Sequence, residues 1–591
     1  MNMKIRHIFT VAYALCFGLH SVSAQNLDPT VVVNKAYEGK LFQVHKPSFE
    51  MAVPDSLTRF ELDFDYLVFE KPYKGADGFS PYELDMQPVA VLKTPKKLYL
   101  DLGAGYSLHP TLDLVWSPFG KGPFRMDVYA SHRSYIGKYR AFYPPALPEG
   151  NIDIERWRGA DADWKGYDFM SRAGVNGSYD ATSLAAGFDV SYFGLASKDL
   201  MKTRMYDALD VRLGVSSKPG SGKHYKYDVQ ASYRYAEDRI DHVETGIGGL
   251  GEHIVNLDAS LGHVLGMAGE VVCDFDIDLA IYDNCDFASV TSQVAISPRY
   301  VLKRERWAVE AGVRLAKVIR PNSSELVFNT RDQIVYPEVK ASLSVIPDAM
   351  RLYAYIGGGN RLNTYAYLLD RNHHVDPLFG IYGHGLLDVT VERVSASVGL
   401  EGRIGSRFCY DVRTGYVNYA NELFDAIAVV PSGSVSDALS TDMYLPGIGY
   451  SACQKYYAAA ELRLETDPFR FDGNLVYTNV WGVKDADGLF APAALTGDFS
   501  AVYNWKRRVY AGMDCNFATD RKGCVTYFAD GAEHEARVPG YVDLGVYLEY
   551  SCNRRLSVWA RGGNLLNMTI QRNPLYAEQG ISGTVGICLN L

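Results

Sequence analysis

The chain alternates apolar and polar residues in runs long enough to cross a membrane as β-strands. The last run places Val585, Ile587, Leu589 and Leu591 on one face and small or polar residues on the other. Because successive side chains of a strand point to opposite faces, one face of this run suits lipid and the other suits water. The C-terminus therefore predicts a membrane-spanning strand.

Runs of the same kind recur along the chain, among them 98–108, 111–116, 124–131, 225–235, 273–281, 542–550 and 556–561. Counting them predicts roughly 22 strands. In a bilayer every backbone N–H and C=O needs a partner, so strands can span only as a closed sheet. We therefore predict an all-β fold, a transmembrane antiparallel β-barrel of residues 96–591, with a short N-terminal periplasmic or lumenal segment.

The N-terminus predicts export. Lys4 and Arg6 precede a mostly apolar stretch at 8–19, and Val22-Ser23-Ala24 forms a small-residue cleavage site, so residues 1–24 are predicted to be a signal peptide. No later segment offers the roughly 18 consecutive apolar residues of a helical span. Residues 25–95 are rich in proline and lack sustained alternation, which predicts a periplasmic or lumen-entering segment.

The amino-acid composition limits which classes of partner the chain can bind. The net charge of −10 argues against nucleic acid, which favours clustered Lys and Arg. The cysteines after the signal are scattered, which favours unpaired thiols over a disulfide framework, and Cys515 and Cys524 are the pair that one hairpin could join. The 42 tyrosines fit either aromatic girdles at the two interfaces or cross-strand packing pairs.

The two ends of such a barrel should differ. Both chain ends of a bacterial barrel usually face the periplasm, so the short turns lie there and the long loops lie outside. The long segments that fit outer loops are Ala141–Trp164, Pro321–Gln333, Leu369–Asp388, Phe424–Tyr450 and Phe517–Pro539.

The C-terminal region contains a recognisable pattern. A strand that begins at 539–544 is followed by the basic turn Asn553-Arg554-Arg555, a second strand, the step Gly563-Asn564-Leu565-Leu566-Asn567 and a final strand. This order resembles the closing strands of TonB-dependent receptors. The resemblance implies a transporter-like barrel in the outer membrane of a Gram-negative bacterium, surrounded by outer-membrane lipid.

The segment before the barrel departs from that family. Its members carry an N-terminal plug, and residues 25–95 are too few for a complete one. An empty barrel of this size would be a wide aqueous hole. Either the short segment, inward-folded loops, or a separate plug or accessory protein is therefore expected to obstruct the lumen.

Residues Thr30, Val31, Val32 and Val33 resemble the short box by which such receptors pair with the energy-transducing TonB protein. Such pairing works by strand addition, for which β-branched residues in an extended tail are suited. The alternative is an ordinary β-prone segment that docks on the chain's own barrel.

Few groups of residues in the sequence suggest a catalytic or ligand-binding site. Asp274, Asp276 and Asp278 share one strand face and form either a lumenal strip that selects for cations or a hydrated wall. His373 and His374 are adjacent, so as strand residues they would point to opposite faces and not share a metal. We expect no metal, no cofactor and no catalytic set, and therefore no enzyme.

The sequence thus predicts a receptor-like barrel that takes part in solute uptake across the outer membrane, with energy from a TonB-like partner as one option. The alternative is a plugless barrel that serves as a structural or assembly platform for partner proteins. The two differ in whether the N-terminal box engages an inner-membrane partner.

Overall fold

A computed structural model of the chain describes residues 97–106, 108–119, 122–139, 164–198, 202–218, 225–242, 249–266, 269–283, 290–319, 334–377, 379, 387–430, 443–483, 488–527, 533–574 and 576–591. The predicted signal peptide, the segment 25–95 and the box Thr30–Val33 lie outside these residues.

The described chain is built almost entirely of strands. The strands that precede the one helix-containing connection are β1 (Leu98–Gly105), β2 (Thr111–Phe119), β3 (Phe124–Tyr139), β4 (Trp164–Asp180), β5 (Leu184–Lys198), β6 (Lys202–Ser217), β7 (Tyr225–His242), β8 (Leu250–Val264), β9 (Gly269–Asp283), β10 (Val290–Lys303), β11 (Trp307–Ile319), β12 (Val335–Ile346) and β13 (Met350–Leu362). Helix α2 (Tyr365–Arg371) follows β13. The remaining strands are β14 (Val389–Ile404), β15 (Phe408–Val430), β16 (Met443–Glu465), β17 (Phe469–Trp481), β18 (Leu489–Phe490), β19 (Leu495–Trp505), β20 (Val509–Ala518), β21 (Arg521–Tyr527), β22 (Glu533–Val538), β23 (Tyr541–Ser551), β24 (Leu556–Gly563) and β25 (Ser582–Asn590).

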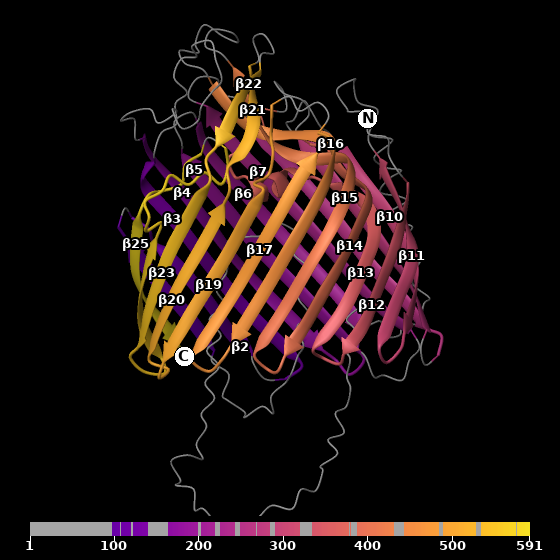
Figure 1. Cartoon of the computed structure of the whole chain (residues 1–591). Helices are drawn as coiled ribbons and strands as arrows, with labels where there is room; N and C mark the ends of the chain where they lie inside the picture. The colour runs from indigo at the N-terminus through magenta and orange to yellow at the C-terminus, as the bar shows by residue number, and fades with distance from the viewer. Residues whose placement is uncertain are drawn as a thin grey trace, which may run out of the picture. The chain divides into compact units, whose positions relative to one another are not determined.

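Twenty-two of these strands form one closed antiparallel barrel, which confirms the predicted fold and strand number (Figure 1). Closure comes from the pairing of β1 with β25, from Tyr99 opposite Asn590 to Gly105 opposite Thr584. The other three strands, β18, β21 and β22, belong to the long connections between barrel strands and pair with one another or with β15. Among the described residues, no helix is long and apolar enough to cross a membrane.

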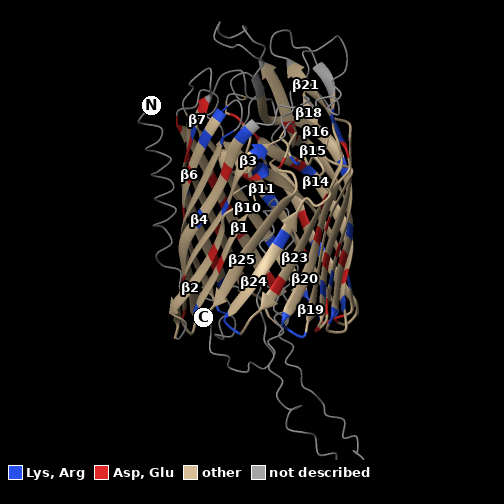
Figure 2. Ribbon diagram, turned by 90° about the vertical axis from the view of Figure 1, so that its left-hand side faces the viewer, with Lys and Arg blue, Asp and Glu red and all other residues tan. Residues whose placement is uncertain are grey.

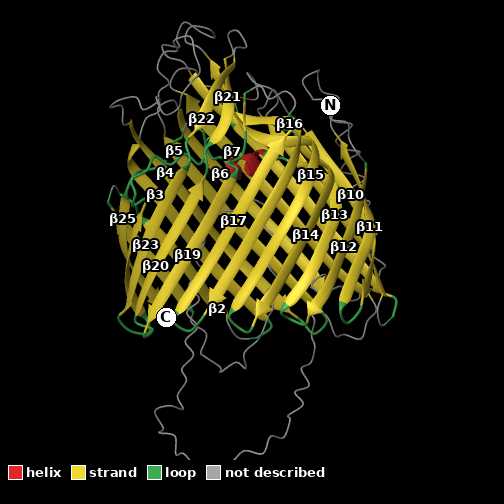
Figure 3. Cartoon of the chain, in the orientation of Figure 1, coloured by secondary structure: helices red, strands yellow, loops and turns green. Residues whose placement is uncertain are grey.

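The two ends of the barrel differ as predicted. Short turns and the C-terminus lie at one end, and the strands that the long connections join end at the other (Figures 1 and 3). Lys97, at the start of β1, also lies at the end with the short turns, because its N–H donates to the carbonyl oxygen of Leu591 at 2.6 Å. We call this end periplasmic and the opposite end extracellular.

The outer and inner faces follow the alternation. On β23, Val546 and Leu548 point outward and are 43% and 52% exposed, whereas Tyr547 between them points into the lumen and is 5% exposed. Exposed aromatic residues at the strand ends nearest the periplasmic turns include Trp116, Phe119, Phe124, Tyr179, Tyr225, Tyr300, Trp307, Tyr503, Trp505 and Tyr550. They form the aromatic girdle that marks a membrane interface.

Some aromatic residues instead pack across strands, so both expected uses of the tyrosines occur. The ring of Tyr353 on β13 lies over Gly399 on β14, where a Cβ atom would come within 2.3 Å of it. The glycine thus makes room for a ring that braces two neighbouring strands. The seven cysteines of the described chain, Cys515 and Cys524 among them, are free thiols.

Trp559 on β24 lies across the junction of the first and last strands. Its ring covers Gly586 on β25 and Gly103 on β1, where added Cβ atoms would lie 2.3 Å and 2.5 Å from ring atoms. Its indole N–H donates to a carboxylate oxygen of Asp101 on β1 at 2.6 Å. One side chain therefore links β24 to β1 over the strand between them.

The outward position of Val546 leads to a prediction. Val546→Arg places a charge on the lipid face and should destabilise the inserted barrel by about 2–4 kcal/mol near the bilayer midplane. The matched control is Asn516→Arg on the lumen face of β20, where Asp498 and Asp543 lie opposite on the adjacent strands. Urea unfolding in vesicles, followed by tryptophan fluorescence, should show a large loss for the first variant and a small one for the second. Equal losses would contradict the assignment of faces.

Candidate functional site

The connection between β13 and β14 folds into the barrel lumen. Figure 3 shows α2 in red inside the barrel near its extracellular end. We call the described part of this connection, residues 363–377 and 379, the lumenal loop. The prediction of a solvent-exposed outer loop at Leu369–Asp388 is therefore wrong for its first part, because Leu369, Val375 and Phe379 are buried.

Side chains of the loop and of the barrel wall accept hydrogen bonds from the first N–H groups of helix α2. The Thr364 side chain accepts a hydrogen bond from the N–H of Tyr367 at 3.2 Å, as an N-cap does. The carboxylate of Glu252, on β8 of the barrel wall, accepts from the N–H groups of Tyr365 at 2.8 Å and Ala366 at 3.0 Å. The wall thus satisfies backbone donors that the first turn of a helix leaves free.

An apolar cluster holds the lumenal loop between two parts of the barrel. The residues that form it are Tyr365, Leu368, Leu369, Val375 and Phe379 from the loop, Leu195, Tyr206, Ala208, Ala236, Leu250, Ala280 and Tyr282 from β5 to β9, and Leu423, Ala426, Ala428, Leu445, Ile448 and Tyr450 from β15 and β16. In addition, the N–H of Asp376 donates to the carbonyl oxygen of Pro446 on β16 at 2.8 Å. The loop therefore bridges wall segments that are far apart in strand order.

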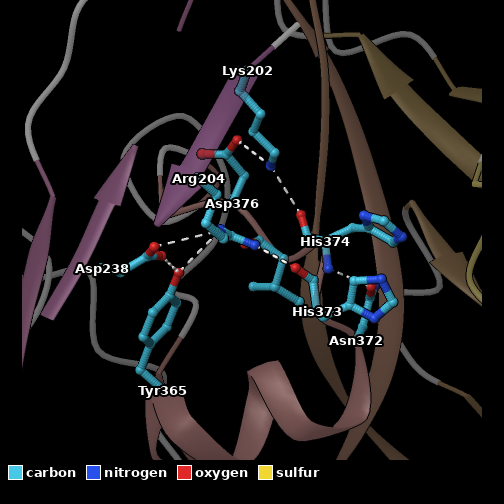
Figure 4. A network of polar contacts seen from close by, with 9 residues as sticks. Lys202, Arg204, Asp238, Tyr365, Asn372, His373, His374 and Asp376 are labelled. Carbon is cyan, nitrogen blue, oxygen red and sulfur yellow. Dashed lines mark hydrogen bonds and ion pairs between the residues drawn. The ribbon is translucent and has the colours of Figure 1, made fainter. Parts of the chain in front are cut away.

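Two buried cations on β6 fix the loop by charge (Figure 4). Lys202 donates to a carboxylate oxygen of Asp376 at 2.7 Å and to the carbonyl oxygen of His374 at 3.0 Å. Arg204, 1% exposed, forms an ion pair with Asp238 on β7 at 3.2 Å and donates to the carbonyl oxygens of two loop residues, His373 and Val375.

Tyr365 completes this network. Its hydroxyl donates to the carboxylate of Asp238 and accepts from Arg204 at 3.2 Å. Buried charges are tolerated only when they are paired and hydrogen-bonded. Because the loop supplies Asp376, the hydroxyl and the carbonyl oxygens, the wall charges and the loop stabilise one another.

The adjacent histidines are half-buried beside the same network. His373 lies 3.6 Å from Asp168 on β4, and the His374 ring stacks on Tyr576 with centroids 3.7 Å apart. Burial lowers the pKa of His374 well below the ordinary value, and the nearby positive groups act in the same direction. Burial also lowers the pKa of His373, although Asp168 opposes this shift. Both imidazoles are therefore held neutral.

The described residues contain no group of three His, Cys, Asp or Glu side chains placed to hold a metal ion. The two histidine rings lie 3.9 Å apart, and the Asp168 carboxylate lies 3.6 Å from His373. The contacts of these two side chains are therefore part of the packing that holds the lumenal loop.

Tyr576 comes from a second inward element, the connection between β24 and β25, which begins with the asparagine-leucine-leucine-asparagine step. Asn564 and Asn567 adopt left-handed backbone conformations, with φ of 45° and 50°. The Asn564 side chain donates to the carbonyl oxygen of Met568 at 2.8 Å and accepts from its N–H at 3.0 Å. The motif that carries the family resemblance is therefore a turn that redirects the chain after the penultimate strand.

The β15–β16 hairpin forms the third element around the loop. Its register shifts between Tyr419 and Glu422, and Figure 1 shows its upper part lying across the extracellular end. The prediction of an outer loop at Phe424–Tyr450 is wrong at both of its described ends, because the strands continue to Val430 and resume at Met443. The apolar run of this segment is buried on both faces and so lacks the alternation expected of a spanning strand.

Asp274, Asp276 and Asp278, which we call the acidic strip, lie on one face of β9. Asp276 pairs with Arg314 on β11 at 2.8 Å, and Asp274 pairs with Arg299 on β10 and accepts from Ser260 at 2.6 Å. Sequence reasoning missed both arginines, because they lie on later strands. It also missed Lys202, Arg204, Asp238 and Glu252, although Thr364 as an N-cap before a helix-prone segment could have indicated the helix that they bind.

Comparisons of sequence find no matching family model and no matching curated protein. Comparison of the structure with solved structures finds outer-membrane proteins. A point mutant of the ferric enterobactin receptor PfeA of Pseudomonas aeruginosa is 10% identical with a TM-score of 0.56, over 84% of this chain and 81% of the receptor.

Two further solved structures are similar. The siderophore receptor PirA of Acinetobacter baumannii is 10% identical with a TM-score of 0.57, over 84% of this chain and 81% of that one. The copper transporter OprC is 12% identical with a TM-score of 0.57, over 84% of this chain and 80% of that one. At these identities the likeness establishes the fold: the chain has the 22-strand barrel architecture of outer-membrane receptors.

Proposed function

We propose that this chain is an outer-membrane barrel that takes part in solute uptake and that its lumenal loop obstructs the resting lumen. The observation that carries the proposal is a loop of the wall itself, held inside a membrane-type barrel by a buried ion pair, by hydrogen bonds from Arg204 and by an apolar cluster. The barrel architecture shared with siderophore receptors and a copper transporter supports a role in solute uptake. In this proposal the lumenal loop supplies the inward-folded obstruction that we expect where residues 25–95 are too few for a complete plug.

The acidic strip suggests the sign of charge that the lumen favours. Arg299 and Arg314 pair with Asp274 and Asp276, whereas Asp278 forms no ion pair with any of the described residues. We propose that this wall attracts cationic groups of a passing solute.

Energy supply is the finer part of the proposal. The box Thr30–Val33 is proposed to pair with a TonB-like inner-membrane protein by strand addition. An uptake barrel needs such coupling to move a bound solute against its gradient, whereas an assembly platform does not. Engagement of the box therefore separates the two hypotheses.

The ion pair of the lumenal loop can be tested directly. Lys202→Glu places two carboxylates together in a buried site, where breaking such a pair costs about 3–5 kcal/mol. Hydrogen exchange of the amides at 365–376 should speed up by at least roughly 100-fold, because each ~1.4 kcal/mol is a factor of ten. The control is Lys226→Glu, which breaks the lumenal pair with Glu270 (2.9 Å) near the periplasmic end and should leave this exchange unchanged. Unchanged protection in Lys202→Glu would mean that the pair does not hold the loop.

Acidification, like Lys202→Glu, should speed up hydrogen exchange of the lumenal loop. Burial lowers the pKa values of His373 and His374 while the lumenal loop is docked on the wall, so the undocked loop binds more protons. Docking of the loop is therefore destabilised as pH falls below about 6.5. Exchange at 365–376, corrected for its intrinsic pH dependence, should therefore rise between pH 7 and pH 5 in the wild type and much less in His373→Gln/His374→Gln.

The box is tested by a proline. Val32→Pro removes an N–H and constrains the preceding residue, so it should abolish crosslinking to an inner-membrane partner through a cysteine placed at position 31. Val32→Ala should retain crosslinking, because strand addition depends mainly on backbone hydrogen bonds. Both variants should float with vesicles and show heat-modifiable gel mobility. If Val32→Pro crosslinks normally, or if no partner is captured, the platform hypothesis is preferred.

A further inference from the structure

Two neighbouring turns at the periplasmic end concentrate positive charge in a chain whose net charge is −10. They join β19 to β20 and β23 to β24, and they are adjacent because β20 pairs with β23. Their exposed cations, which we call the basic turns, are Lys506, Arg507, Arg508, Arg554 and Arg555. Figure 2 shows Lys and Arg colouring on turns at the end that holds the C-terminus.

The backbone of the basic turns is fixed while their side chains point into solvent. The carbonyl oxygens of Arg508 and Arg555 accept from the N–H groups of Ser551 and Asn590, both at 2.8 Å. Within the described part of the chain, Lys506, Arg508 and Arg555 form no ion pair. Neither turn contains an acidic residue.

The first basic turn adopts a backbone conformation that its residues disfavour. The N–H of Arg508 donates to the carbonyl oxygen of Trp505 at 3.1 Å, and the two central residues, Lys506 and Arg507, have φ of 51° and 55°. This is a type I′ turn, in which Asn and Gly are strongly preferred. Strained backbone often accompanies a functional requirement for particular side chains. Here the strain accompanies two adjacent cations.

The position of the basic turns indicates what they meet. Trp505 and Tyr550 lie on the outer face of the strands that enter the two turns and are 54% and 46% exposed. The Lys506 ammonium lies 5.4 Å from the centroid of the Trp505 ring. Because exposed Trp and Tyr mark the membrane interface, these cations lie at the depth of lipid headgroups.

We propose that the basic turns bind the phosphate groups of anionic phospholipids in the periplasmic leaflet. The inference rests on the membrane insertion proposed above. Clustered cations at an anionic leaflet gain affinity from each charge, and an arginine can contact phosphate oxygens through two N–H groups. The barrel would thereby carry its own anionic lipid at one sector of its periplasmic rim.

The experiment uses the full chain and counts bound lipid by native mass spectrometry. The protein is equilibrated in detergent with equal amounts of phosphatidylglycerol and phosphatidylcholine of the same acyl chains. The wild type should retain phosphatidylglycerol at least about fivefold over phosphatidylcholine, and Lys506→Gln/Arg507→Gln/Arg508→Gln should lose that preference. The charge-preserving control, Lys506→Arg/Arg507→Lys/Arg508→Lys, should keep it.

A second variant separates lipid binding from folding. Lys506→Asn/Arg507→Gly supplies the residues that a type I′ turn prefers, so it should fold at least as well as wild type while its preference for phosphatidylglycerol falls. Flotation with vesicles and heat-modifiable mobility report insertion of each variant separately. If insertion fails in the wild type, the proposed function fails.

If insertion holds, three results would overturn the lipid proposal. One is equal retention of the two lipids by the wild type. Another is an undiminished preference in either cation-removing variant. The last is complete displacement of phosphatidylglycerol by about 10 mM inorganic phosphate but not by equal ionic strength of chloride, which would indicate a site for a small anion.

Discussion

The pairing of β1 with β25 is the constraint on which the rest of the structure depends. Lipid offers no hydrogen-bond partner, so unpaired first and last strands would leave two rows of N–H and C=O groups exposed at a cost that no side chain offsets. The register from Tyr99–Asn590 to Gly105–Thr584 removes both edges. Trp559 reinforces the junction through a hydrogen bond to Asp101, a residue 458 positions away in sequence.

Closure also decides what the interior must contain. With apolar side chains turned outward, the inward face collects charges such as Arg204 and Asp238, which are too deep to rely on water. The lumenal loop satisfies them with its own polar groups and covers the apolar upper wall with Leu368 and Leu369. The contacts that stabilise the wall are therefore the same ones that hold the loop in its proposed obstructing position.

The barrel could be predicted from sequence because its signal is local. Period-two alternation in segments such as 582–590 assigns a face to each residue without knowledge of its neighbours. The upper part of the β15–β16 hairpin could not be predicted, because Ala426 and its neighbours are buried on both faces. Their sequence therefore does not alternate between apolar and polar residues. The position of the lumenal loop could not be predicted from sequence, because Lys202 and Asp376 are 174 residues apart and form their ion pair only in the folded barrel. Local patterns cannot indicate which strand a loop will reach.

The most direct test of a closed barrel is a disulfide across the junction of its first and last strands. Leu100 and Leu589 are opposite one another on β1 and β25, and both face outward. In a chain without other cysteines, Leu100→Cys/Leu589→Cys should crosslink on oxidation in isolated outer membranes and change the gel mobility of the boiled protein. The pair Leu100→Cys/Leu475→Cys, with Leu475 on the distant β17, should not crosslink. Failure of the first pair, or equal crosslinking of both, would contradict the closed barrel.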